Sequence, residues 1–287
     1  MKCHINVLEL LAAELAILTF TKNQRALSVH MQIDNTVALS YLTKMGGTKS
    51  WELTKIAKRI WQYLLDKEIT LTAEWIPSQL NVIADWESRN VEDTTEWKLN
   101  PVVFQGICQS MGKPNMDLFA SRVSNQLPAY MCLKADPWCH AVDAFKQNWT
   151  PFFPYAFPPF CLISKVLNQV SRQKVERMII ITPLWTCQPW YPLLLSMTIQ
   201  EPILLPNSTQ LLQNPQQQSH PLLHTSSLRL VAWLVSGRHC LVKEFQTKLQ
   251  TSSSMLGEKA LEAIMNQPGR SGVCGVIGEK LIHLTAL

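Results

Sequence analysis

Two short strand patterns, each followed by a helix, most strongly limit how the first part of this chain can fold. Residues 29–34 and 69–75 both alternate between apolar and polar side chains, as strands with one covered face do. Residues 5–20 and 50–66 repeat their apolar side chains at helical spacing, which predicts two helices that each bury one stripe. Residues 1–92 are therefore expected to form an α/β unit with only two strands.

Three acidic residues occupy comparable positions in this pattern. Glu9 lies on the first helix beside its apolar stripe, Asp34 ends the first strand, and Asp85 starts the helix after the second strand. Strand ends and helix starts converge at one edge of such a unit, so we expect the three carboxylates to lie together. Each acid also has an ordinary explanation, because acids are common at helix starts and strand ends. Glu14, on the first helix, is expected to be a solvated helix acid.

Composition narrows the class of protein without deciding it. A length of 287 residues allows one large domain or two small ones, and a net charge of +5 fits a solvated surface as well as a nucleic-acid partner. The eight scattered cysteines form no CxxC pair, which predicts reduced thiols in an intracellular protein, cytoplasmic or nuclear. No secretory signal is visible and the longest apolar runs are too short to span a bilayer, so no membrane partner is expected.

The three acidic motifs, in this order, resemble the C-terminal part of a ribonuclease H domain. The likeness is closest to the copy in polyproteins of DIRS-type (tyrosine-recombinase) retrotransposons, and it rests on the stretches 6–10, 34–38 and 75–89. It implies that Glu9, Asp34 and Asp85 are catalytic metal ligands. Two Mg²⁺ ions held there would hydrolyse RNA in RNA–DNA hybrids, and the expected partner is such a hybrid or DNA.

The chain departs from that family in two respects. The family's domain begins with three antiparallel strands that carry its first metal-binding Asp, whereas this sequence starts at the helix after them. Trp75 stands near the place where the family commonly has a His. We therefore expect an incomplete two-ion site, no nuclease activity from this chain alone, and a need for the upstream reverse transcriptase and ribonuclease H strands as a partner. The alternative is a non-catalytic nucleic-acid-binding protein built on the same elements.

Residues 93–205 alternate short apolar runs with helical ones, which predicts a small Rossmann-like α/β domain with a buried parallel sheet. The stretches 117–120 and 158–160 resemble the methyltransferase-like segment that follows ribonuclease H in DIRS-type polyproteins. More distantly, they are similar to phage DNA adenine N6-methyltransferases, in which an Asp/Asn-Pro-Pro-aromatic motif holds a flipped adenine. The resemblance implies a degenerate cofactor- and base-binding site made of Asp117, Phe157, Pro158, Pro159 and Phe160.

Phe157 stands where that motif needs a side-chain acceptor, and no Gly-rich nucleotide-binding loop stands out. We therefore expect a methyltransferase-type fold without S-adenosylmethionine chemistry, although an active DNA adenine methyltransferase stays as an alternative function. The ordinary explanation of residues 157–160 is a rigid apolar turn at a strand end. Residues 206–287 are expected to form a linker and a poorly ordered tail, with a short helix at 259–265.

Overall fold

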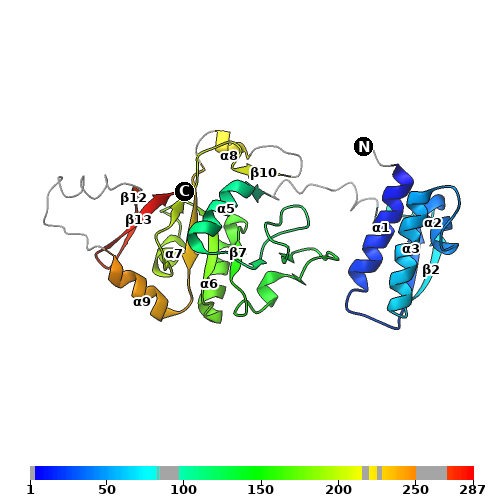
Figure 1. Ribbon diagram of the computed structural model, residues 1–287, viewed down its shortest axis with the longest axis horizontal. Coiled ribbons are helices and arrows are strands. Elements are labelled where there is room, and N and C mark those ends of the chain that lie inside the picture. Colours follow the sequence, from blue (N-terminus) through cyan, green and yellow to red (C-terminus); the bar gives the residue numbers. More distant parts are fainter. Residues whose placement is uncertain (1–3, 83, 85–96, 215–219, 225–227, 250–269) are drawn as a thin grey trace. The chain divides into compact units, whose positions relative to one another are not determined.

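The computed structural model describes residues 4–82, 84, 97–214, 220–224, 228–249 and 270–287. The chain divides into two compact units, shown in Figure 1. The first unit comprises Met1–Asp93 with Ala135–Pro137, and the second comprises Thr94–Lys134 with Trp138–Leu287. Among the described residues, no helix has the length and apolar character needed to cross a membrane.

The first unit follows the predicted order of elements. It contains α1 (Ile5–Phe20), β1 (Ser28–Ile33), α2 (Thr36–Thr43), α3 (Trp51–Asp66) and β2 (Thr70–Trp75). The strands form a two-stranded parallel sheet in which Ser28 pairs with Thr70 and Ile33 with Trp75. Ser50 caps α3 by accepting a hydrogen bond from the Leu53 N–H, as its position before the helix predicts.

The core of the first unit lies between its three helices and one face of this sheet. α1, α2 and α3 supply most of its buried side chains, and alternate residues of the strands, such as Val29 and Leu71, pack against them. The other face of the sheet is exposed and polar. There His30 lies 3.0 Å from the Thr72 hydroxyl and 3.1 Å from a Glu74 carboxylate oxygen.

Glu14 was expected to be solvated, and this prediction was wrong. Its side chain is buried where α1 packs on α3, and the Arg59 guanidinium donates two hydrogen bonds to its carboxylate, at 2.7 and 2.5 Å. Burial of a carboxylate is tolerated here because a bidentate cation neutralises it. Glu14 and Arg59 are 45 residues apart in the sequence. The pattern of apolar residues along α1 alone therefore does not predict that they pair.

The second unit is built on a seven-stranded mixed sheet. Its strands lie in the order β12-β13-β9-β11-β8-β7-β4. Their bounds are β4 (Met116–Asp117), β7 (Pro154–Ala156), β8 (Met178–Pro183), β9 (Ile203–Leu204), β11 (Leu230–Val235), β12 (Arg270–Ile277) and β13 (Lys280–Ala286). Two short pairs stand apart from it, β3 (Lys98–Leu99) with β10 (Leu212–Gln213), and β5 (Met131–Cys132) with β6 (Ala141–Val142).

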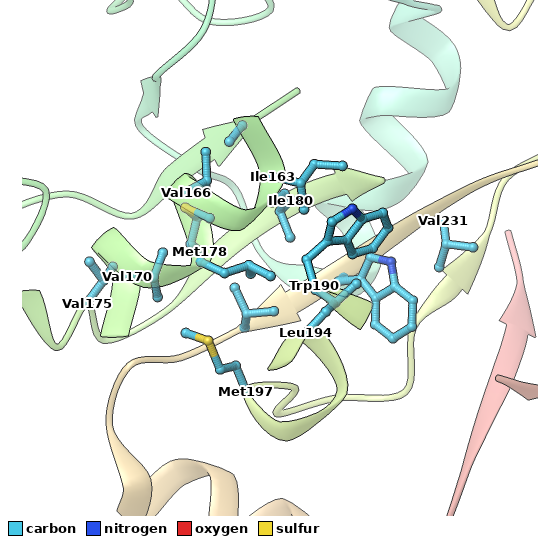
Figure 2. Packing of buried hydrophobic residues seen from close by; sticks show 14 of the residues in the cluster. Ile163, Val166, Val170, Val175, Met178, Ile180, Trp190, Leu194, Met197 and Val231 are labelled. Carbon is cyan, nitrogen blue, oxygen red and sulfur yellow. The ribbon is translucent and has the colours of Figure 1, made fainter. Parts of the chain in front are cut away.

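Helices cover both faces of this sheet. They are α5 (Pro101–Met111), α6 (Ile163–Gln173), α7 (Tyr191–Ser196), α8 (Pro221–His224) and α9 (His239–Lys248), with the 3₁₀ turns η1 (Ala144–Lys146) and η2 (Phe160–Leu162). Alternate residues of β8 and β11 enter two separate core clusters, one containing α6 and α7 and the other α5. Figure 2 shows Val166 and Val170 of α6 close to Met178 and Ile180 of β8. Full burial of such a side chain contributes roughly 1.5–3 kcal/mol.

The direction of the strands confirms the expected parallel sheet only in part. β4, β7 and β8 pair in parallel, and β9 runs in the same direction because β11 is antiparallel to both β8 and β9. Short apolar runs predict that a strand is buried, but the strand's direction depends on connections that they do not specify. The sheet is therefore mixed rather than parallel.

The expectation of a poorly ordered tail over 206–287 was wrong for β11, β12 and β13. All six residues of β11 are buried and the strand lies between β8 and β9, inside the sheet. The continuous apolar run at 230–235 is typical of a strand covered on both faces, and a polar, Pro-interrupted stretch before it does not prevent its return to the sheet. The helix expected at 259–265 lies outside the described residues.

Candidate functional site

A pair of carboxylates forms the candidate site of the first unit. Asp34 follows β1 directly, and Asn35 then caps α2 by accepting a hydrogen bond from the Ala38 N–H at 2.9 Å. The Asn35 amide also donates to the side-chain oxygen of Asn6 at 3.0 Å, which fastens the first turn of α1 to the end of β1. Glu9 stands three residues after Asn6 and therefore on the same face of α1, on the side of Asp34.

The electrostatics of the pair agree with this placement. Both side chains are half-buried. Burial raises the pKa of Glu9, and the negative charge of Asp34 raises this pKa further. In the part of the chain that the structure describes, no lysine or arginine forms an ion pair with either acid. Two like charges held together without a cation of the protein make a place where a bound cation is favourable.

Trp75 fixes the backbone beside the pair. It ends β2, and its indole N–H donates to the main-chain oxygen of Asp34 at 3.1 Å. The next N–H, of Ile76, donates to the Ile33 oxygen at 3.0 Å, so the ends of both strands are held at one edge. The carboxyl edge of a parallel sheet is where open α/β folds bind their ligands.

The third predicted ligand, Asp85, lies outside the described residues, so the structure does not test its position. Within the described ranges, no three His, Cys, Asp or Glu side chains lie close enough together to hold a metal ion. The acids that do come together, Glu9 and Asp34, offer only oxygen ligands. They therefore fit part of a Mg²⁺ site and do not fit the nitrogen and sulfur preference of zinc.

The second unit carries its candidate residues at the carboxyl ends of β7 and β8. The Phe157 and Phe160 rings lie 6.4 Å apart, and the Phe160 ring lies 5.2 Å from the ring of Trp185, edge to face. A second aromatic pair, Phe119 and Phe145, has its centroids 5.4 Å apart. All five rings are half-buried, so part of each is open to solvent.

The turn between these rings has a plain structural role. Pro158 is buried and Pro159 exposed, and the Pro159 oxygen accepts from the Leu162 N–H at 2.8 Å to begin the 3₁₀ turn that leads into α6. The predicted rigid turn at a strand end is therefore present. The same turn also places Phe157 and Phe160 at the edge of the sheet, so its structural role does not exclude a role of these two rings in binding.

Asp117 differs from the other predicted residues of this unit, because its carboxylate faces the core. Its side chain is 2% exposed, and its Oδ2 accepts a hydrogen bond from the Gln126 N–H at 3.0 Å. Beside it lies Tyr155 of β7, also fully buried, which the motifs did not indicate. No local pattern marks Tyr155, because its importance comes from the register of β4 against β7.

Comparison of the sequence with protein-family models and with curated proteins gives no match.

Proposed function

We propose that the first unit is the C-terminal part of a ribonuclease H-like domain of a retroelement polyprotein. In this proposal Glu9 and Asp34 are two of the carboxylates that hold its divalent metal ions, and Asp85 is the third. The observation that carries it is the Asn6–Asn35 hydrogen bond at 3.0 Å, which holds α1 against the end of β1 and so brings Glu9 to Asp34. The motif order of the sequence supports the same conclusion.

The residues of this unit have separate tasks in the proposed site. Divalent ions held there would supply the chemistry of water activation and of charge neutralisation on the leaving oxygen of the phosphodiester. Glu9 and Asp34 hold the ions, and cation binding relieves the repulsion that raises the pKa of Glu9. Asn6 and Asn35 set the distance between the two elements, and Trp75 holds the main chain of Asp34. Even with Asp85 the proposed site has three carboxylates, fewer than the ribonuclease H family uses to hold two magnesium ions, so the proposal expects metal binding without cleavage by this chain alone.

Paramagnetic broadening by Mn²⁺ tests the metal site on the full chain. In ¹H–¹⁵N NMR spectra, the amide signals of Glu9, Asp34 and Asn35 and the Trp75 indole signal are expected to broaden first. Asp34→Asn is expected to remove this selectivity, whereas Glu52→Gln, an exposed acid on α3, keeps it. Broadening that is unchanged in Asp34→Asn, or that centres on acids of the second unit, contradicts the site.

A cleavage assay separates the site from the activity. The full chain is incubated with a labelled RNA–DNA hybrid and Mg²⁺, and no cleavage above the metal-only blank is expected. Magnesium-dependent cleavage that Asp34→Asn abolishes keeps the proposed site and overturns the proposed inactivity. Cleavage that Asp34→Asn leaves unchanged assigns the activity to other residues.

A second candidate function, nucleobase binding without chemistry, is favoured by the half-exposed rings of the second unit. Base–aromatic stacking contributes about 1–3 kcal/mol per base, so Phe160→Ala is expected to weaken binding of a short single-stranded oligonucleotide about five- to 150-fold. Fluorescence anisotropy of a labelled oligonucleotide reports the binding, and Phe20→Ala, which removes an exposed ring of the first unit, serves as control. Calorimetry with S-adenosylmethionine is expected to show no heat, and micromolar binding revives the methyltransferase alternative.

A further inference from the structure

Two buried oxygen atoms of the second unit lie on neighbouring strands without hydrogen-bond partners. Asp117 of β4 pairs in register with Tyr155 of β7, so both side chains project from the same face of the sheet. Both side chains are buried, and within the described residues neither Asp117 Oδ1 nor the Tyr155 hydroxyl has a partner. Buried polar atoms are nearly always hydrogen-bonded, so two exceptions side by side call for an explanation.

The other oxygen of the same carboxylate anchors a loop. Asp117 Oδ2 accepts from the Gln126 N–H, and the Asp117 N–H donates to the Ala129 oxygen, both at 3.0 Å. The Gln126 side chain continues the connection by donating to the main-chain oxygen of Leu99. The C-terminal part of the loop 118–129 is thus hydrogen-bonded to Asp117, the residue that directly precedes the loop.

The surroundings of Asp117 disfavour its charged form. Tyr155 faces Asp117 from β7, and Cys108 of α5 contributes to raising the pKa of the Tyr155 phenol. Lys98 of β3 is the cation that lowers the pKa of the Asp117 carboxyl. Lys98 forms no ion pair with it among the described residues. Burial raises the pKa of Asp117 to about 7, against the opposing effects of the Gln126 and Phe119 N–H groups and of Lys98.

We infer that Asp117 is a pH-responsive latch, whose neutral carboxyl fits the core and whose ionisation loosens the loop 118–129. An unpaired carboxylate costs far more to bury than an unpaired carboxylic acid. The folded state holds its proton more tightly than the unfolded state. Stability is therefore lost as pH rises from about 4 to about 7 and is level above that. The inference rests on the second unit and does not depend on the proposed function of the first.

Loosening of the loop also affects an aromatic side chain at the edge of the sheet. Phe119 is the second residue of the loop, and its ring lies against that of Phe145, with the ring centroids 5.4 Å apart. When the loop 118–129 loosens, the ring of Phe119, one of the five half-buried rings at this edge of the sheet, therefore becomes less firmly held. Binding at this edge, where it occurs, becomes weaker at high pH through the loop rather than through the charge of any ligand.

Hydrogen exchange of the full chain tests the latch. Protection factors of the Gln126 and Asp117 amides, which donate the two hydrogen bonds of the latch, are corrected for the intrinsic rate and are expected to fall by up to about tenfold per pH unit between pH 5 and 7. Asp117→Asn is expected to abolish this slope. Glu176→Gln, which removes an exposed carboxylate from the same unit, keeps it. A slope that persists in Asp117→Asn overturns the inference.

A measurement on the unmodified chain covers the case in which Asp117→Asn does not fold. The ¹³C signal of the Asp117 carboxyl is followed through a pH titration. A midpoint near 7 is expected, together with loss of protection over the same interval. A midpoint near 4, or a midpoint near 7 with unchanged protection, overturns the latch.

Discussion

The two units each end a strand with an aspartate, and the two carboxylates meet opposite surroundings. Asp34 of the first unit is half-buried and faces a second acid, Glu9, whose pKa is raised by burial and further by the charge of Asp34. Asp117 of the second unit is buried beside a phenol, and desolvation raises its pKa to about 7. A cation relieves the first arrangement and a proton relieves the second. An acid at a strand end is therefore proposed as a binding group in one fold context and as a structural group in the other.

The units also differ in how much core supports these acids. The first has two strands with helices packed on one face. The second has a seven-stranded sheet with separate hydrophobic clusters on its two faces. The following predictions test whether the units and their acids behave as differently as this comparison implies.

The largest effect is expected from Trp233→Ala in the second unit. Trp233 is fully buried in β11 and donates to the Thr182 hydroxyl at 2.9 Å. Truncation leaves a cavity and an unpaired hydroxyl, and is expected to lower the free energy of unfolding of this unit by about 3–5 kcal/mol. Denaturant unfolding with probes in each unit measures it. The first unit is expected to keep its midpoint, and a shared shift contradicts independent units. Trp51→Ala, an exposed tryptophan, is the control.

Glu14→Gln is expected to destabilise the first unit by roughly 1–2 kcal/mol. Breaking a fully buried pair costs more, but the Arg59 side chain is 47% exposed and water partly replaces its partner. The matched control is Glu52→Gln, on the exposed face of α3, with an expected change under about 0.5 kcal/mol. Equal effects of the two substitutions contradict the role of the ion pair.

A smaller loss, of about 0.5–1.5 kcal/mol, is expected from Trp75→Phe. The ring is retained as an apolar surface, and only the hydrogen bond from the indole to the Asp34 oxygen is removed. Thermal unfolding of the first unit measures the loss. In the Mn²⁺ experiment the same variant is expected to broaden fewer signals around Asp34, and unchanged broadening shows that Trp75 does not position the pair.

The smallest change in stability is expected from Asp34→Asn. Removing the charge of Asp34 lowers the pKa of Glu9 toward its ordinary value. A raised pKa in the folded state costs stability above the ordinary Glu value, so the substitution is expected to stabilise the first unit at neutral pH by about a few tenths of a kcal/mol. A ¹³C titration of the Glu9 carboxyl checks this directly. An unchanged pKa of Glu9 shows that the two acids do not interact.

The elements of the first unit were predictable because each depends on a local period. The helices at 5–20 and 51–66 and both strands follow from apolar spacing alone, and the approach of Glu9 to Asp34 follows from motif order. The Glu14–Arg59 pair was not predictable, because it joins helices whose packing the sequence does not specify. The position of Asp85 stays a prediction.

In the second unit, the burial of strands was predictable and their arrangement was not. The apolar run of β8 indicated a covered strand, and the rings of Phe157 and Phe160 lie at a strand end as expected. β11 carries the same signal as β8 but follows a polar stretch, so it was assigned to a tail. The burial of Asp117 beside Tyr155 depends on how β4 pairs with β7. The residue pattern within one strand does not predict this pairing.

The place of β11 also sets the order in which the molecule can fold as it is synthesised. Every contact of the first unit's sheet is made once residue 75 has left the ribosome. In the second unit β8 and β9 are joined only when Leu230–Val235 pairs with both of them. The backbone N–H and C=O groups on their facing edges therefore stay unpaired while more than twenty further residues are added. Pairings that close over long stretches of chain form slowly. The nascent second unit is therefore expected to expose unpaired strands for longer than the first unit does.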